Sequence, residues 1–205
     1  MNKLVKRIIE LSYRNKLTHV SSCLNTVNLL ENIYLMRKRD DPVVLGNSHA
    51  ALALYVILEH NGLCDAEDMI NKHGVHASRD MQNGIWVSGG SLGQPETIAV
   101  GMALSDRKKN VWLITSDGAM SEGSVWESLY FAEEQMLMNL HISIVVNGFG
   151  AYRSIDSHYL WRRCNESFKD LDWTFHLTEM PFPWLEGLDG HYLVISDEQY
   201  REAMA

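Results

Sequence analysis

The chain has 205 residues, a length that predicts a single domain with a self-standing core. Its composition is ordinary for a globular protein, with 46% hydrophobic and 21% charged residues. The formal net charge of -8 argues against nucleic acid as a partner, because sequence-independent nucleic-acid binding needs a basic surface.

Helical periodicity dominates the first hundred residues. Apolar side chains recur at helical spacing in several stretches, and a short apolar run at residues 43–45 interrupts them. Residues 73–93 have no clear period and are rich in His, Gly, Asn and Ser, so they predict a long loop. Long loops in compact domains are usually functional. The predicted helices span residues 3–14, 24–37, 50–60 and 95–105.

The cysteines and the N-terminal residues indicate a cellular location. Cys23, Cys64 and Cys164 are widely spaced and odd in number, as expected for free thiols in a reducing compartment. The basic residues near the N-terminus precede no apolar stretch long enough for a signal peptide or a membrane span. We therefore expect a cytoplasmic protein with no membrane partner.

The middle of the chain predicts a strand, a helix and a second strand. Residues 111–115 and 142–146 are near-continuous apolar runs with several β-branched residues, which suits strands buried on both faces. Val125, Leu129 and Met136 mark a helix between them. Such a βαβ unit predicts an α/β fold with a parallel sheet and helices on both faces.

The last quarter of the chain has weak periodicity and many aromatic residues. We expect a single domain over residues 1–205 in which residues 151–185 form an irregular, aromatic-rich segment. A last strand is predicted at residues 192–195 and a last helical turn or two at residues 197–203. The tryptophans of this part are Trp161, Trp173 and Trp184.

Two dipeptides follow the two predicted strands directly. Asp117 and Gly118 follow the first strand, and Asn147 and Gly148 follow the second. Ligands gather at this edge of a parallel sheet, and glycine lets a phosphate approach the backbone. Carboxylate and amide oxygens suit Mg²⁺ or Ca²⁺ shared with phosphate oxygens. Each dipeptide alone is a turn in most proteins, so the predicted metal and diphosphate site depends on the pair.

Three histidines share one kind of setting. His19, His49 and His76 all lie at the ends of predicted elements or in loops, among small polar residues or glycine. A single loop histidine is usually only solvated. Three of them predict a set that binds hydroxyl groups and shuttles protons.

A glycine-rich stretch at residues 89–94 is the last motif. It predicts either a flexible loop tip or a backbone that lies against a flat heterocycle. Alone it does not distinguish the two.

Taken in order, these motifs resemble the N-terminal half of transketolases, the domain that grips the diphosphate of thiamine diphosphate. The resemblance covers roughly residues 3–150 and implies a thiamine-diphosphate-binding fold. The sequence departs from the usual family pattern at Ser21, Pro95 and Ser116, and beyond residue 150 the match is poor. The matching residues are His19, residues 45–49, His76, residues 90–94, residues 116–118, residues 122–123, residues 126–127, and residues 147–148.

The resemblance implies a role for each residue at the diphosphate end. Asp117 and Asn147 would be ligands of Mg²⁺ or Ca²⁺. The carbonyl oxygen of Phe149 would be the third protein ligand. Gly118 and His49 would contact the diphosphate of the cofactor.

The resemblance also implies roles at the other end of the cofactor. The backbone of Gly90, Ser91 and Leu92 would face the aminopyrimidine ring. His19 and His76 would face the sugar or sugar-phosphate substrate. The implied reaction is the transfer of a two-carbon ketol unit from a ketose to an aldehyde acceptor.

Glu122 and Glu127 match acidic residues that connect paired active sites across the subunit interface of transketolases, so the resemblance implies a dimer-based assembly. Transketolases also need a pyrimidine-binding domain, which lies beyond the region that this chain matches. We therefore expect a separate C-terminal subunit that carries it.

Two alternatives to a transketolase subunit stay open. One is a subunit of an enzyme like deoxyxylulose-phosphate synthase, although the histidine contexts favour transketolase. The other is a degenerate paralogue with a binding or regulatory role and no chemistry. The presence of both Asp117 and Asn147 favours catalysis over that second alternative.

Overall fold

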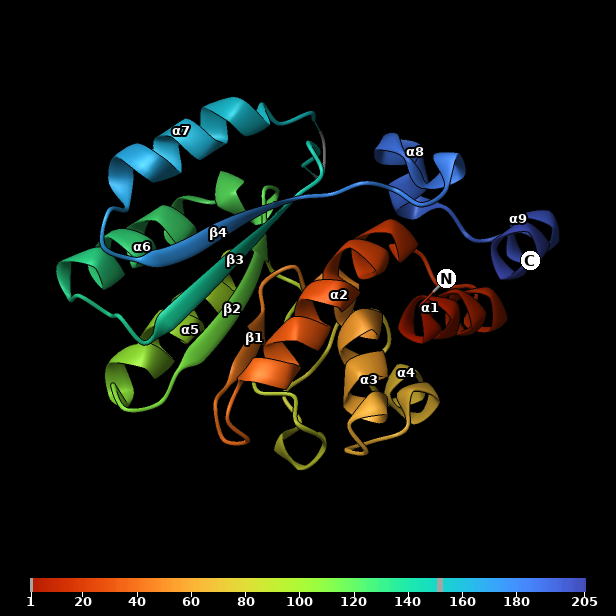
Figure 1. Ribbon diagram of the computed structural model, residues 1–205, viewed down its shortest axis with the longest axis horizontal. Coiled ribbons are helices and arrows are strands. Elements are labelled where there is room, and N and C mark those ends of the chain that lie inside the picture. The colour runs from red at the N-terminus through yellow and green to blue at the C-terminus, as the bar shows by residue number, and fades with distance from the viewer. Residues whose placement is uncertain (1, 151–152) are drawn as a thin grey trace.

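The structure is a computed structural model that describes residues 2–150 and 153–205. Its centre is a parallel sheet of four strands in the order β1-β2-β3-β4 (Figure 1). Helical crossovers connect the strands, as parallel pairing requires. The predicted α/β fold with a parallel sheet is therefore confirmed. The strands are β1 (Val43–Leu45), β2 (Val111–Ser116), β3 (Leu140–Val146) and β4 (Asp172–Leu177).

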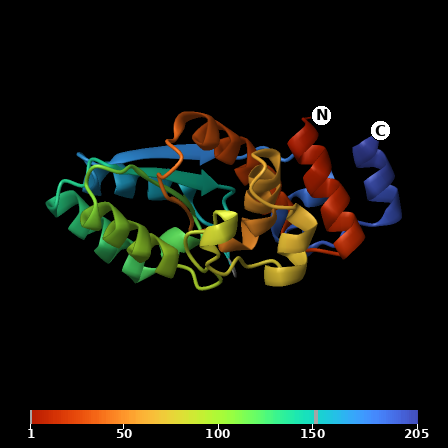
Figure 2. The same ribbon diagram turned by 90° about the horizontal axis from the view of Figure 1, so that it is seen from below.

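Helices cover both faces of this sheet, as predicted. Alternate residues of a strand point to opposite faces, so Val43 and Leu45 belong to one buried apolar cluster and Val44 to another. Figure 2 shows α2 on one side of the sheet and α5 on the other. The first cluster includes α1 (Lys3–Asn15), α2 (Val20–Met36), α3 (Ala51–His60) and α4 (Ala66–His73). The second includes α5 (Gln94–Ser105), α6 (Gly123–Glu134) and α7 (Ser157–Ser167).

The prediction of an irregular segment at residues 151–185 is wrong. Residues 151–152 lie outside the described part of the chain, and the residues after them form α7 and β4. In β4, Trp173 and Phe175 alternate with polar residues and pack against the second cluster. This period-two pattern was obscured by the other aromatic residues around it. The helical signal of α7 was weak because the helix buries only two side chains.

The strand predicted at residues 192–195 is also absent. Tyr192 instead ends a short helix, α8 (Gly187–Tyr192), and the residues after it lead into α9 (Asp197–Met204), where a final helical turn is expected. Across residues 2–150 and 153–205, no helix has the length and apolar character needed to traverse a lipid bilayer. Short 3₁₀ turns lie at Ser48–Ala50, Met81–Asn83, Ala119–Ser121 and Pro183–Leu185.

Candidate functional site

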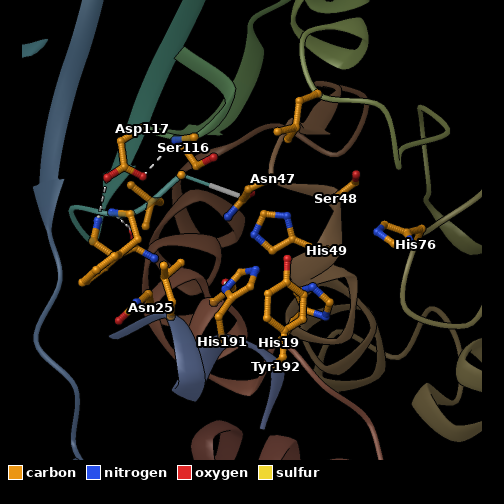
Figure 3. Close-up of a pocket in the computed structure, with 18 of the residues that line it drawn as sticks. His19, Asn25, Asn47, Ser48, His49, His76, Ser116, Asp117, His191 and Tyr192 are labelled. Carbon is orange, nitrogen blue, oxygen red and sulfur yellow. Dashed lines mark hydrogen bonds between the residues drawn. The ribbon is translucent and has the colours of Figure 1, made fainter. Parts of the chain in front are cut away.

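A pocket of about 230 Å³ lies at the carboxyl ends of β1, β2 and β3 (Figure 3). This is the edge at which parallel sheets bind ligands. Figure 3 shows Asp117 at one end of the pocket, His76 at the other and His49 between them. The residues predicted from the sequence that line it are His19, His49, His76, Gly90, Leu92, Asp117, Gly118, Asn147 and Phe149.

Asp117 connects the two loops that follow β2 and β3. Its side chain is 2% exposed, and one carboxylate oxygen accepts hydrogen bonds from the backbone N–H groups of Asn147 (3.2 Å) and Gly148 (2.8 Å). The other carboxylate oxygen accepts the N–H of Gly118 at 3.0 Å. Burial raises the pKa of the Asp117 carboxyl to about 6, while these three donors oppose the rise. The two dipeptides that the sequence singled out therefore meet around one buried carboxylate.

Three kinds of oxygen atom gather at this end of the pocket. The side-chain oxygen of Asn147 accepts the N–H of Phe149 at 2.8 Å and keeps a second lone pair. The carbonyl oxygen of Phe149 lies 3.8 Å from the point where a Cβ on Gly118 would stand. Among the described residues, no three His, Cys, Asp or Glu side chains are arranged to hold a metal ion.

Four histidines form the other end of the pocket. The ring of His19 lies 5.4 Å from that of His49, 6.4 Å from that of His76 and 4.6 Å from that of His191, measured between centroids. Burial lowers the pKa of His19 to about 4 and that of His49 to about 3, and the neighbouring histidines add to both shifts. Both rings are therefore neutral near pH 7. A neutral imidazole has one donor and one acceptor, which suits the recognition of a hydroxyl group.

The backbone of His19 adopts an unusual conformation at the start of α2. Its φ is +64°, a left-handed value that is uncommon for a residue other than glycine. Its N–H donates to the carbonyl oxygen of His191 at 3.0 Å, and its ring Nδ1 lies 2.7 Å from the hydroxyl of Thr18. Strained backbone of this kind persists where surrounding contacts fix it, and it is frequent at functional sites.

His191 is a pocket residue that sequence reasoning missed. It comes from α8, and its Nδ1 lies 3.4 Å from the hydroxyl of Ser22. Burial lowers its pKa as well. One signal for it was present, because His191 follows Asp189-Gly190 and so shares the small, glycine-containing setting of the other three histidines.

Asn47 and Ser48, also missed as individual residues, support the wall between the two ends. Asn47 donates from its amide nitrogen to Thr26 at 2.9 Å, while its side-chain oxygen is buried with no partner among the described residues. The hydroxyl of Ser48 accepts the N–H of Gly90 at 2.6 Å. A Cβ on Gly89 would stand 2.0 Å from that of Ser48, so this approach of the glycine-rich loop requires glycine.

Three predicted residues lie outside the pocket. Ser91 is exposed and does not line it, unlike its neighbours Gly90 and Leu92. Glu122, which immediately precedes α6, and Glu127, within α6, are also exposed and do not line the pocket. The interface role proposed for these two glutamates stays a prediction.

Glu96, at the first turn of α5, is a buried carboxylate behind the pocket. It is 0% exposed, and its Oε1 accepts a hydrogen bond from Thr115 at 2.6 Å. Its Oε2 has no partner among the described residues. Burial raises the pKa of Glu96, because it penalises the charged form more than the Thr115 hydrogen bond favours it.

Replacing Glu96 by glutamine is expected to stabilise the protein at high pH. The folded state binds the Glu96 proton more tightly than the unfolded state, so the native protein loses stability as the pH rises from the ordinary glutamate range through the raised pKa. Glu96→Gln removes this loss and should increase the free energy of unfolding by roughly 1–3 kcal/mol at pH 8. Urea denaturation at several pH values measures the difference.

The same substitution at the exposed Glu134 is the matched control and should show no such pH dependence. An E96Q effect that stayed constant between pH 5 and pH 8 would contradict a charged, buried Glu96 as its cause.

The fold and part of the sequence are similar to known proteins. No family model matches the chain. It is 29% identical over 155 residues to an apulose-4-phosphate transketolase subunit of Phocaeicola vulgatus, a match that covers 66% of this chain and 55% of that protein. It is 32% identical over 142 residues to the 6-deoxy-6-sulfo-D-fructose transketolase subunit SqwG of a Clostridium species, covering 60% and 52%.

A solved structure extends the likeness to the whole fold. Transketolase from Campylobacter jejuni has a TM-score of 0.71 at 15% identity, and the match covers 99% of this chain and 43% of that one. The chain thus spans about half the length of the two curated subunits that it matches. In sequence and in fold, this chain is similar to the transketolases and to the subunits of split transketolases.

Proposed function

We propose that this chain is the N-terminal subunit of a two-component transketolase-like enzyme. The enzyme transfers a two-carbon ketol unit from a ketose to an aldehyde acceptor and depends on thiamine diphosphate and Mg²⁺. The observation that carries this proposal is one pocket with a buried Asp117 at one end and neutral histidines at the other. Two relatives whose names call them transketolase subunits support it.

The residues at the Asp117 end fit a divalent cation and a diphosphate. Asp117 is a buried carboxylate whose negative charge a cation would compensate, and hard oxygen ligands suit Mg²⁺ or Ca²⁺. Asn147 and the carbonyl of Phe149 would complete the protein ligands. The cofactor phosphates would supply the remaining oxygens beside Gly118 and His49, where glycine leaves room for a close approach.

The histidines would act on the substrate. When bound, thiamine diphosphate supplies the carbon nucleophile that attacks the ketose carbonyl, chemistry that belongs to the cofactor. His19 and His76 would hold substrate hydroxyls, and a neutral imidazole such as His19 can accept or donate a proton as the carbon–carbon bond breaks. The burial of His49 would keep these hydrogen bonds strong.

The second wall of the cleft would come from other chains. The backbone of Gly90, Ser91 and Leu92 would meet one side of the aminopyrimidine ring. A separate C-terminal subunit would supply the pyrimidine-binding domain. Self-association through the exposed surface at the start of α6, which includes Glu122 and Glu127, would pair two such sites. We place this assembly in the cytoplasm, with sugars or sugar phosphates as substrates and no nucleic-acid or membrane partner.

Two of the departures from the usual family pattern are compatible with a catalytic site. Pro95 stands in the first turn of α5, where proline is tolerated because the N–H has no helical partner. The hydroxyl of Ser116 accepts the N–H of Ala119 at 3.2 Å and leaves the pocket open. Neither residue removes a proposed ligand, so we retain the catalytic proposal over the regulatory one.

Cofactor binding should depend on the partner subunit. The chain alone offers one wall of the cleft, so we expect weak binding of thiamine diphosphate in the presence of Mg²⁺. Binding should be at least about tenfold tighter, about 1.4 kcal/mol, once the cognate pyrimidine-domain chain is added. Isothermal titration calorimetry on the chain with and without that partner measures both values. Equally tight binding without the partner would contradict the two-component arrangement. No binding in either sample would contradict the proposal that thiamine diphosphate is the cofactor.

A further inference from the structure

Tyr192 lines the pocket beside the histidines. Its ring packs edge-on against His19, with the centroids 5.4 Å apart, and against His191, with the centroids 4.9 Å apart. Figure 3 shows its hydroxyl directed toward His49. The residue is 54% exposed, so it contacts the pocket histidines while part of it stays open to solvent.

The segment that carries Tyr192 is held firmly in place. Leu185, at its start, is 1% exposed and packs into the first apolar cluster. A Cβ on Gly190 would stand 2.3 Å from the backbone of Leu185, so the chain turns tightly between them. The carbonyl of His191 accepts the N–H of His19. Contacts at both ends of α8 therefore fix Tyr192 over the pocket.

We propose that Tyr192 determines the length of the aldehyde acceptor, so that the site prefers short-chain sugars. This inference rests on the proposed function. A sugar held by His19 and His76 has one end at the reacting carbon, and the rest of its chain must leave the pocket past the rim. Tyr192 lines the pocket and its ring packs against His19, so we place the ring in the path of the distal carbons. A long acceptor must displace the ring, whereas a two- or three-carbon aldehyde does not reach it.

The hydroxyl and the ring of Tyr192 have separable effects. The ring occupies space and excludes the distal carbons of a long sugar. The hydroxyl, directed toward His49, takes no part in this exclusion. Tyr192→Ala removes both, while Tyr192→Phe keeps the ring. The preference for short acceptors should therefore depend on the ring, so Tyr192→Ala should lose it and Tyr192→Phe should keep it.

The first test measures how far Tyr192 shields His19 from a reagent, and it needs no enzymatic activity. Diethyl pyrocarbonate acylates neutral imidazoles, and mass spectrometry of the digested chain reports modification at each histidine. In Tyr192→Ala the modification rate of His19 should rise several-fold, and in Tyr192→Phe it should stay at the wild-type value. An equal rate in wild type and Tyr192→Ala would overturn the placement of Tyr192 over His19. His158, on α7 and outside the pocket, serves as an internal reference within each sample.

The second test measures acceptor choice in the assembled enzyme with its partner. The value of kcat/KM is compared for glycolaldehyde, D-glyceraldehyde 3-phosphate and D-ribose 5-phosphate. Tyr192→Ala should raise the long-to-short ratio about tenfold or more, a range that changes in pocket size produce, and Tyr192→Phe should keep the wild-type ratio. Normal turnover with an unchanged ratio in Tyr192→Ala would overturn this inference alone. A complex that turns over no acceptor in any form would overturn the proposed function and this specificity with it.

Discussion

Replacing Asp117 by asparagine is expected to weaken Mg²⁺-dependent binding of thiamine diphosphate by about 100-fold or more. Even residues that only orient metal ligands cost 10–100-fold in affinity when changed, and Asp117 is proposed as a direct ligand. Asparagine has nearly the same shape but carries no charge. Its amide NH₂ would also face backbone N–H groups, which in the wild type donate to the carboxylate of Asp117. Calorimetric titration of the cofactor with Mg²⁺, in the presence of the partner subunit, measures the loss.

The exposed Asp170 offers the matched control for this substitution. Asp170→Asn makes the same chemical change on the surface and should leave cofactor affinity as it is. The circular dichroism spectrum should show that Asp117→Asn is folded. A folded Asp117→Asn protein with wild-type affinity would show that the metal is bound elsewhere or is not required.

Replacing Gly190 by alanine is expected to destabilise the protein by about 3 kcal/mol and to open the histidine end of the pocket. The new Cβ would meet the backbone of Leu185 at 2.3 Å, and backbone cannot rotate away as a flexible side chain can. α8 must then move, and the hydrogen bond between the carbonyl of His191 and the N–H of His19 should be lost. Urea denaturation measures the stability, and diethyl pyrocarbonate modification of His19 reports the opening.

Gly101, in the middle of α5, provides the opposite case. A Cβ there would meet no atom within 4 Å, and alanine favours a helix over glycine by about 0.5–1 kcal/mol. Gly101→Ala should therefore be neutral or stabilising. If Gly190→Ala were as stable as Gly101→Ala, the tight packing of α8 against Leu185 would be contradicted.

The parts of the fold that depend on local pattern could be predicted from the sequence. The apolar runs that became β2 and β3 are buried on both faces, and an apolar face at helical spacing marked α1. α2 began four residues earlier than expected, at Val20, because its first turn is buried through small residues such as Ser21 and Ser22 that carry no hydrophobic signal. α7 and β4 pack on one face only, so their patterns were too weak to distinguish from an irregular segment.

The candidate site divides in the same way. The rule that parallel strands end at one edge of the sheet is enough to bring Asp117 and Asn147 together from the amino-acid sequence alone. His191 could not be placed by such a rule, because its position depends on the path of the chain after β4 and on the packing of Leu185 and Gly190. Such long-range packing leaves little trace in the local sequence.

The hydrogen bond between His19 and His191 has a consequence for the order of events during synthesis. It joins a residue that precedes all four strands of the sheet to one that follows them in chain order. Domains fold as units, and chains emerge from the ribosome at about 5–20 residues per second. The sheet is therefore synthesised before residues 185–192, and the histidine end of the pocket cannot form until those residues have emerged. A nascent chain arrested before Gly187 should hold the Asp117 end in place while His19 lacks the carbonyl that fixes its backbone. The two ends of the pocket would therefore form at different times, the Asp117 end first and the histidine end after it.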